Sequence, residues 1–221
     1  MASVAPRRTR LARADRMEQT LSVARSLFAE RGYSAVTMDE LAAQVGVTKP
    51  LLYNYFGNKE RLYIACMERA GDALTATIAD SVAAPTTPGE ALRGGVQAFF
   101  AFLDSDRAAW VVLFDETLPR GGEVADRVAD YRGQIVQLIS SSPLAQLPPR
   151  SRRGAKVEVE ALAVILLGAA EALARWWLRT EAISAQEAAE MLISTIEPGL
   201  RRRSASAAKP STKTKPKGDR Q

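Results

Sequence analysis

The chain has 221 residues, of which 47% are apolar, and a formal net charge of +5. It contains one cysteine, Cys66, and no histidine, so an internal disulfide is impossible and a metal-binding cluster of Cys and His is missing. The familiar acid-base and acyl-transfer motifs, including a nucleophile elbow and a phosphate-binding glycine loop, are missing too. We therefore expect a non-enzymatic protein of a reducing compartment, with no metal and no cofactor.

The positive charge is concentrated at the two ends of the chain. Residues 1–16 carry five arginines and one aspartate, a net charge of +4, and residues 201–221 carry eight basic residues and one aspartate, a net charge of +7. Residues 17–200 therefore carry the remaining net charge of −6. Basic tails around an acidic body fit a polyanionic partner, and they fit a gain in solubility equally well.

Two further observations concern disorder and membranes. Residues 201–221 contain no aromatic or branched aliphatic side chain, so we expect this tail to be disordered, together with residues 1–12. The basic start of the chain is not followed by the apolar stretch of a signal peptide. The most apolar run, residues 161–170, is half the length of the ~20 residues that span a bilayer. We expect a cytoplasmic protein with no membrane partner.

Apolar residues at helical spacing predict an all-α fold, and capping residues set the expected helix boundaries. The first helix covers residues 15–31 and ends at Gly32. The spacing of Thr37 and Glu40 predicts a capping box at the start of a short helix over 38–44. Thr48 precedes a second short helix that ends near Phe56, with a proline in its first turn. The longer helix over 59–82 follows.

The second half of the chain repeats these start signals. Thr87 with Glu90 and Ser184 with Glu187 predict further capping boxes. Residues 143–154 are rich in proline and basic residues and predict a loop. The helices expected from these patterns cover residues 88–103, 107–114, 123–139, 156–179 and 185–197.

The two short helices have the features of a helix-turn-helix. Val45, Gly46 and Val47 form the turn between them, and Ala42 is small enough for the helices to approach closely. At the start of the second helix, Thr48 and Lys49 lie where free amides and the helix dipole favour phosphate. Hydroxyl and amide groups further along suit phosphates or base edges, although a tyrosine in the core is an equally ordinary reading for Tyr53. The side chains concerned are Tyr53, Asn54 and Tyr55.

This segment resembles the N-terminal domain of the TetR family of transcriptional regulators. The family pattern is carried by Leu27, Phe28, Gly32, Tyr33, Thr37, Met38, Leu41, Ala42, Val45, Gly46, Val47, Thr48, Leu52, Tyr53, Tyr55, Phe56, Lys59 and Leu62. Two positions depart from it, since the family often has a small residue at Pro50 and histidine at Tyr55. The resemblance implies that Thr37 and Lys59 bind the DNA backbone. It also implies that the second short helix faces DNA through Thr48, Lys49, Tyr53, Asn54 and Tyr55.

These observations predict four segments. They are a disordered basic arm (1–12), a helix-turn-helix DNA-binding domain (13–60), a helical ligand-binding and dimerisation domain (61–200) and a disordered basic tail (201–221). The helix over 156–179 is apolar around most of its circumference and must be covered on more than one side. With 185–197 it fits a four-helix bundle, made either between two chains or within one chain. The family resemblance implies a homodimer through these two helices.

Several aromatic residues lie on the other predicted helices of the C-terminal part. They line a ligand cavity or close a solid core. Glu171 needs a partner inside an apolar stretch, and Arg175 one turn later or a bound molecule supplies it. The candidate ligand-binding residues are therefore Phe99, Phe102, Trp110, Phe114, Tyr131, Glu171 and Arg175.

The family resemblance implies a repressor that a small-molecule effector releases from its DNA operator. Two alternatives remain at this point. One is a nonspecific nucleic-acid binder that acts through its basic tails. The other is a helical protein that binds a small molecule and not DNA.

Overall fold

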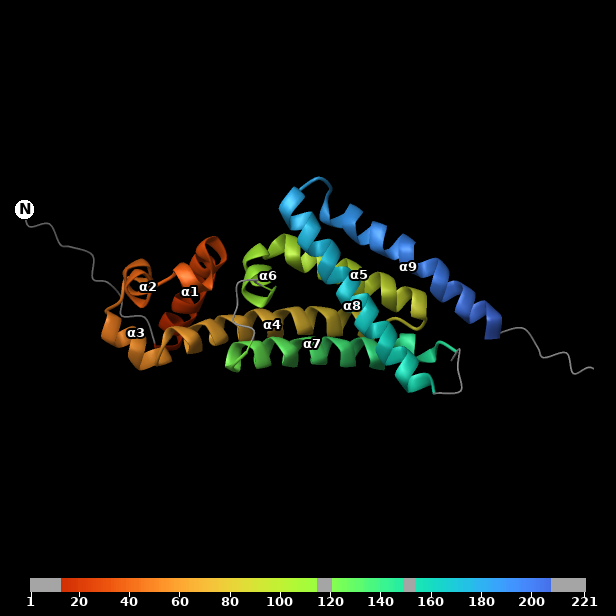
Figure 1. The fold of residues 1–221 in the computed structure, drawn as a ribbon, viewed down its shortest axis with the longest axis horizontal. Helices are drawn as coiled ribbons and strands as arrows, with labels where there is room; N and C mark the ends of the chain where they lie inside the picture. The colour runs from red at the N-terminus through yellow and green to blue at the C-terminus, as the bar shows by residue number, and fades with distance from the viewer. Residues whose placement is uncertain (1–12, 115–120, 149–153, 208–221) are drawn as a thin grey trace, which may run out of the picture. The chain divides into compact units, whose positions relative to one another are not determined.

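The computed structural model describes residues 13–114, 121–148 and 154–207. In these ranges the chain forms nine α-helices, one short 3-10 helix and no strand, which confirms the predicted all-α fold (Figure 1). Two segments, 1–12 and 201–221, were expected to be disordered. Residues 1–12 and 208–221 lie outside the described residues.

The helix boundaries follow the sequence pattern closely. Inside α1, Gly32 has the non-helical angles φ 75° and ψ 160°, so this helix breaks at the predicted residue although its last turn lies beyond. The elements are α1 (Arg13–Ala35), α2 (Met38–Val45), α3 (Lys49–Phe56), α4 (Lys59–Ala83), α5 (Pro88–Ser105), α6 (Arg107–Phe114), α7 (Glu123–Ser141), η1 (Pro143–Gln146), α8 (Ala155–Thr180) and α9 (Ala185–Ala207).

All three predicted capping boxes are present. At α2, the Thr37 amide donates to Glu40 Oε2 at 2.9 Å, and the Glu40 amide donates to Thr37 Oγ1 at 3.3 Å. The same pair of bonds joins Thr87 to Glu90 and Ser184 to Glu187. In each box the hydrogen bond from a backbone amide is the main cause that holds the pKa of the glutamate below its ordinary value.

Helix α9 is longer than predicted, because it continues from residue 197 to Ala207. The expectation that the whole of 201–221 is disordered is therefore wrong for residues 201–207. Arg203 explains the difference: its Nη2 donates to Glu158 Oε2 at 2.9 Å and to the Pro148 carbonyl at 3.1 Å, and its side chain is only 9% exposed. An arginine that finds a carboxylate in the fold orders the residues around it, which composition alone does not reveal.

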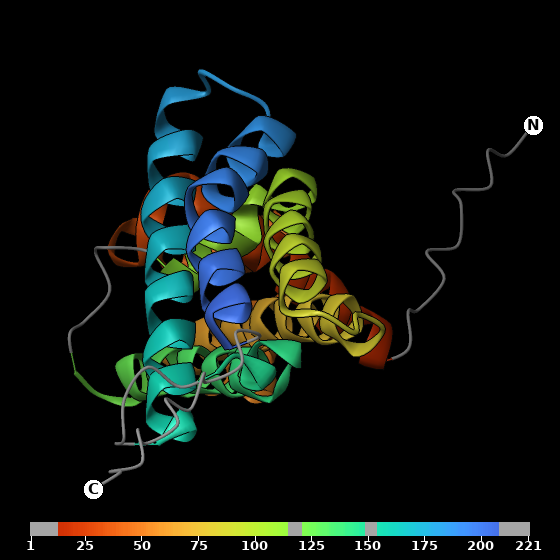
Figure 2. The ribbon, with the colours of Figure 1, turned by 90° about the vertical axis from the view of Figure 1, so that its right-hand side faces the viewer.

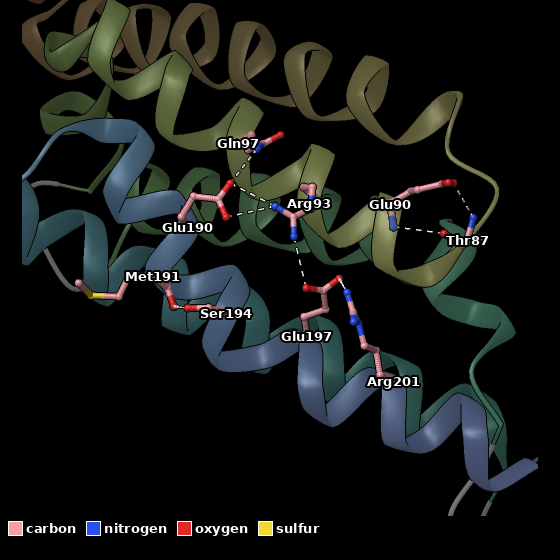
Figure 3. Close-up of polar contacts among 9 residues, drawn as sticks. All are labelled: Thr87, Glu90, Arg93, Gln97, Glu190, Met191, Ser194, Glu197 and Arg201. Atoms are coloured by element: carbon pink, nitrogen blue, oxygen red, sulfur yellow. Dashed lines mark hydrogen bonds and ion pairs between the residues drawn. The ribbon is translucent and has the colours of Figure 1, made fainter.

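A second charged cluster attaches α9 to α5 (Figure 3). The Arg93 guanidinium lies between two glutamates of α9, with 3.1 Å to Glu190 and 3.3 Å to Glu197. Gln97 also donates to Glu190, and Arg201 donates to Glu197 at 3.0 Å. One arginine of α5 thus contacts carboxylates about two turns apart on α9, which fixes the register of the two helices.

The described residues form two compact units. One consists of the described residues up to Ala76 and of those between Phe102 and Gly133, and the other of Thr77–Ala101 and the described residues from Gln134 onward. The first unit thus contains α6 and the first half of α7 in addition to the predicted DNA-binding segment, and the expected boundary at residue 60 falls inside it. In the second unit α8 and α9 pack against each other as neighbours (Figure 2).

Aromatic packing holds the first unit together. The Tyr63 ring of α4 contacts Phe28 and Tyr33 of α1 edge to face, at centroid distances of 4.9 and 5.0 Å. Its hydroxyl donates to the Val112 carbonyl of α6 at 2.9 Å. Asp106 adds a polar contact, since it pairs with Arg25 of α1 and accepts a hydrogen bond from the amide of Ala109 in α6.

Helices α4 and α7 approach closely at Gly71. A Cβ atom on Gly71 would lie 2.6 Å from the Tyr131 ring. This ring cannot swing away easily, because its hydroxyl is held by the Glu68 carbonyl at 3.1 Å and by Asp72 Oδ1 at 2.9 Å. Burial, and then the hydrogen bond to Asp72, raise the pKa of Tyr131.

This contact predicts opposite effects for two glycine substitutions. Gly71→Ala should lower the free energy of unfolding by about 1–3 kcal/mol, the usual cost of overpacking. Gly133→Ala is the matched control: Gly133 lies in α7 with nothing within 4 Å of its would-be Cβ, so alanine should raise the free energy by about 0.5–1 kcal/mol. Urea titrations at one fixed protein concentration measure both. Equal effects of the two substitutions would contradict the proposed close packing.

Candidate nucleic-acid interface and ligand cavity

The turn between α2 and α3 has the geometry of a helix-turn-helix. Gly46 ends α2 in the left-handed conformation, with φ 74° and ψ 34°. The amide of Val47 donates back to the Ala42 carbonyl at 3.0 Å, so the chain turns sharply and starts α3 two residues later. A side chain at Gly46 would be strained in this conformation.

The two short helices bury one face each and expose another. Leu41 and Val45 of α2 and Leu52 and Phe56 of α3 are buried, so these apolar residues fix how the helices cross. The opposite face of α3 is exposed, and Tyr53 on it is 42% exposed. The structure therefore places five of the predicted DNA-binding residues on one short helix: Thr48, Lys49, Tyr53 and Asn54 are exposed, and Tyr55 is half-buried at the side.

The start of α3 differs from the start of α2. Thr48 occupies the N-cap position with extended angles, but its side chain makes no capping hydrogen bond. The amides of Lys49 and Leu51 in the first turn of α3 lack helical partners, as at any helix start, and Pro50 between them has no amide hydrogen. Unlike Thr37, whose hydroxyl is held by Glu40, Thr48 leaves this site open to an anion. A phosphate suits such a site by both hydrogen bonding and the helix dipole.

Two predicted backbone-binding lysines already have partners in the fold. Lys49 pairs with Asp39 of α2 at 2.9 Å, and this hydrogen bond raises the pKa of Lys49. Lys59 donates to the carbonyls of Tyr33 and Val36, at 3.1 and 3.0 Å, and lies 4.5 Å from the Tyr33 ring centroid. An ammonium has three donors, and two of those of Lys59 fix the end of α1 to the start of α4.

The second unit contains a small apolar cavity. Its volume is about 50 Å³, which is space for a few water-sized probes of about 10–15 Å³ each. Ser142 is the one polar side chain among its described lining residues, and its hydroxyl already donates to the Ile139 carbonyl at 2.7 Å. The lining consists of Ile78, Val82, Ala91, Leu92, Gly95, Val96, Phe99, Ile135, Ile139, Ser142, Leu144, Leu166, Leu167 and Ala170.

Of the seven predicted ligand-binding residues, Phe99 lies in this lining. Trp110 and Phe114 stack on each other in α6 at 4.3 Å, in the first unit, and Tyr131 packs on Gly71 there. The described lining does not include Phe102, Glu171 or Arg175 either. The helical spacing of the aromatic residues thus indicated buried helix faces and not the cavity. Three residues of α8 at the cavity, Leu166, Leu167 and Ala170, cannot be told from ordinary core residues in the sequence.

One side of α8 is apolar and exposed. Ile165 is 63% exposed, and Val157, Val164 and Trp176 are exposed on the same helix. Nothing in the described chain lies within 4 Å of a Cβ placed on Gly168, which sits in the same strip. Met191 of α9 is an exposed apolar side chain too, at 49%. Although it is apolar, α8 is not a candidate for crossing a bilayer, and the same holds for each helix in the described ranges.

Comparison with known proteins agrees with this architecture. Residues 21–66 match the family described as "Bacterial regulatory proteins, tetR family", and residues 88–197 match "Tetracyclin repressor-like, C-terminal domain". The crystal structure of a TetR-like transcriptional regulator from Rhodococcus sp. RHA1 is 31% identical, with a TM-score of 0.71, over 87% of this chain and 99% of that one. The chain belongs to the TetR family. The family predicted from the helix-turn-helix pattern is thereby confirmed.

Two further comparisons show how far the similarity extends. The HTH-type transcriptional activator FasR of Mycolicibacterium smegmatis is 36% identical over 122 residues, and the aligned part covers 55% of this chain and 56% of FasR. This chain thus matches little more than half the length of that relative. The regulator FadR from Bacillus subtilis, solved in complex with stearoyl-CoA, has a TM-score of 0.67 over 80% of this chain and 97% of that one. At 18% identity this likeness concerns the fold alone.

The orientation of α3 predicts different consequences for two neighbouring residues. Tyr53→Ala should change the free energy of unfolding by less than about 0.5 kcal/mol, as for other surface positions, but should weaken DNA binding about fivefold, the equivalent of one hydrogen bond. Leu52→Ala should cost about 2–5 kcal/mol of stability, because Leu52 is fully buried. Urea unfolding and fluorescence anisotropy on duplexes selected by the wild-type protein measure the two effects. A Tyr53→Ala protein that is destabilised like Leu52→Ala would place Tyr53 in the core.

Proposed function

We propose that this TetR-family chain is a cytoplasmic, non-enzymatic regulator that binds operator DNA and represses transcription until a small apolar effector releases it. The observation that carries the proposal is the free surface of α3. Its exposed side bears Lys49, Tyr53 and Asn54, and the N-cap Thr48 makes no capping bond. A short helix with polar tips and an open N-terminus suits the major groove, where phosphates position the helix and base edges specify the sequence.

The pairs made in the free protein assign different tasks to the DNA-binding residues. Thr48 and the first amides of α3 would bind a phosphate, and Tyr53 and Asn54 would reach base edges. Lys49 would exchange its exposed bond with Asp39 for a phosphate, which costs little because exposed ion pairs contribute only ~0–1 kcal/mol. Tyr55, Thr37 and Lys59 would add backbone contacts from the sides of the motif.

The cavity supports an effector with an apolar, extended portion. The walls are hydrocarbon, and the hydroxyl of Ser142 is satisfied within the chain, so a ligand gains little there from polar groups. At about 50 Å³ the cavity is smaller than any such ligand, so binding has to push the helices around it apart. A fatty acyl chain is a suitable occupant.

Helix α4 provides a direct connection from the cavity to the DNA-binding helices. It contributes Ile78 and Val82 to the cavity wall, and its first residue, Lys59, holds the end of α1. In this mechanism, a ligand that widens the cavity moves the C-terminal end of α4. The movement changes the position of α3, which precedes the N-terminal end of α4. An effector that binds only the widened form lowers operator affinity by its preference for that form.

This mechanism predicts that filling the cavity abolishes release but not DNA binding. Ala170→Leu places three more carbons in the void and should lower the free energy of unfolding by no more than about 1–3 kcal/mol, the usual cost of overpacking. The exposed Ala101→Leu on α5 adds the same volume outside the cavity. Operator binding is titrated with acyl-CoA thioesters and free fatty acids of 4 to 18 carbons. Wild type and Ala101→Leu should release the operator with at least one probe, and Ala170→Leu should not. Equal release from both variants would exclude this cavity as the effector site.

We also propose that two copies pair through the exposed apolar strip of α8, together with the neighbouring α9, to form a homodimer. Isolated apolar side chains are common on surfaces, but a continuous strip of Val157, Val164, Ile165 and Trp176 suits an interface. Gly168 in the middle lets a second backbone approach closely, because nothing in the described chain occupies that space. A two-fold dimer also presents two α3 helices to successive major grooves.

A charge in this strip should separate the copies. Ile165→Glu would bury a carboxylate without a partner at the interface, so the protein should sediment as a monomer and lose most operator affinity. Gln137→Glu, on the exposed side of α7, adds the same charge elsewhere and should remain dimeric. Sedimentation velocity at several concentrations measures this. If Ile165→Glu stays dimeric, the interface lies elsewhere.

A basic tail that binds nucleic acid without sequence preference is the remaining alternative. Because α9 continues to Ala207, removal of residues 208–221 deletes only the segment beyond the described helix. The truncated protein should still distinguish a selected operator from unrelated DNA. Loss of nearly all affinity for both duplexes would favour the alternative.

A further inference from the structure

We infer that the two copies of the chain join their α8 helices in opposite directions, and that Glu160 and Arg179 select a second copy as the partner. This inference rests on the proposed homodimer. It goes further, because it fixes which residues of the strip face each other and which residues exclude other chains. The carrying observation is an exposed ridge of α8 whose side chains change in size and charge from one end to the other.

The ridge consists of residues four apart, which lie one above another on the surface of a helix. Its members are Glu160, Val164, Gly168, Ala172 and Trp176, and each of them is exposed in the described chain. Small residues occupy the centre of the ridge, and an apolar side chain flanks them on each side. Nothing in the described chain lies within 4 Å of a Cβ placed on Gly168. A second helix backbone can therefore approach α8 most closely between Gly168 and Ala172.

The order of sizes along the ridge favours an antiparallel copy. When two α8 helices run in opposite directions about a two-fold axis between the small residues, each Gly168 faces the partner's Ala172. Trp176 then lies against the partner's Val164. An indole ring that is 37% exposed thus covers a valine that is 55% exposed, and both leave water. Helices that run in the same direction would instead place the two Trp176 rings on each other, which keeps the backbones apart near Ala172.

The charges at the two ends of the strip support the same arrangement. Glu160 begins the ridge, and Arg179 follows Trp176 in the last turn of α8. Glu160 and Arg179 are exposed, and neither side chain has an ion pair or a hydrogen bond to any described residue. From position 170, midway between the small residues, the distance along the axis is about 15 Å to Glu160 and about 14 Å to Arg179. In antiparallel copies the two residues therefore reach the same level, and a glutamate meets an arginine at both ends of the contact.

The same two charges determine which chain can be the partner. In helices that run in the same direction each charge would meet its own copy, and like charges across an interface repel each other. A different chain with an apolar helix meets the same obstacle unless it carries the opposite charge at each level. Exposed ion pairs contribute little affinity, so the pair of Glu160 with the partner's Arg179 serves selection more than strength. The apolar part of the ridge supplies the affinity.

Charge exchange between the two positions tests the inference. In Glu160→Arg the new arginine meets the partner's Arg179, and in Arg179→Glu the new glutamate meets the partner's Glu160. Each variant alone should raise the dissociation constant of the dimer about 30-fold, since two symmetry-related pairs are affected by roughly fivefold each. An equimolar mixture of the two variants should restore the dimer, because one chain then supplies both arginines and the other both glutamates. Asp104→Arg, at an exposed site of α5, is the matched control and should dimerise like wild type.

Sedimentation velocity over a range of concentrations gives these constants. Recovery in the mixture is the decisive result, since two misfolded variants would not regain a partner. A mixture that stays monomeric, or wild-type affinity of either single variant, overturns the inference. Wild type in the same runs separates this failure from a failure of the proposed dimer. If wild type is a monomer, the homodimer itself is wrong and the inference falls with it, whereas a dimeric wild type with a different variant pattern contradicts the arrangement alone.

The register is measured independently with a short bis-maleimide linker. Cys66 is buried, and burial raises the pKa of its thiol to about 12, so an added exposed cysteine reacts selectively. In the antiparallel dimer the two copies of residue 160 lie about 30 Å apart along the axis, and those of residue 179 about 27 Å. Glu160→Cys alone and Arg179→Cys alone should therefore not be linked, whereas the double variant should be linked into a dimer. Linking of either single variant contradicts the arrangement, as does a double variant that sediments as a dimer and is not linked.

Discussion

The interaction on which the DNA-binding unit depends is the packing of Tyr63 between helices of distant sequence. Its ring meets Phe28 and Tyr33 of α1, and its hydroxyl bonds to the Val112 carbonyl of α6. Lys59, one turn earlier on α4, bonds to the carbonyls of Tyr33 and Val36. The first turns of α4 are therefore fixed to the end of α1, immediately before the helix-turn-helix. These contacts couple the start of α4 to the end of α1, which leads directly into α2.

Local sequence predicted the elements well because each boundary has a local cause. The capping boxes at Thr37, Thr87 and Ser184 need only residues three apart, and the break at Gly32 needs only one glycine. The end of α9 was missed because its cause is not local. Arg203 orders the last turns by reaching Glu158, 45 residues earlier in the chain, and no composition rule contains that pair.

The same distinction applies to the functional residues. The surface of α3 was predictable, since an exposed helix with Lys49, Asn54 and Tyr53 departs from the ordinary pattern and matches a family motif. The cavity was not predictable, because its position depends on how side chains from several helices pack against one another. Phe99 lies at the cavity while Trp110 and Phe114 stack on each other in α6, and all three look alike in sequence. A void in a well-packed interior leaves no mark on the residues that surround it.

The basic residues of the proposed DNA-binding surface already have partners in the free protein. Lys49 lies on Asp39, Lys59 on two carbonyls, and Arg13 on the Tyr55 ring. The partners of Lys49 and Arg13 are weak enough to be exchanged for a phosphate, since exposed pairs and cation–π contacts contribute only ~0–1 kcal/mol each. If α3 binds DNA as proposed, these contacts hold the side chains near their working positions before DNA arrives, which lowers the entropy lost on binding. Binding then draws its electrostatic free energy from released counterions, while the geometry comes from contacts that the free protein has already made.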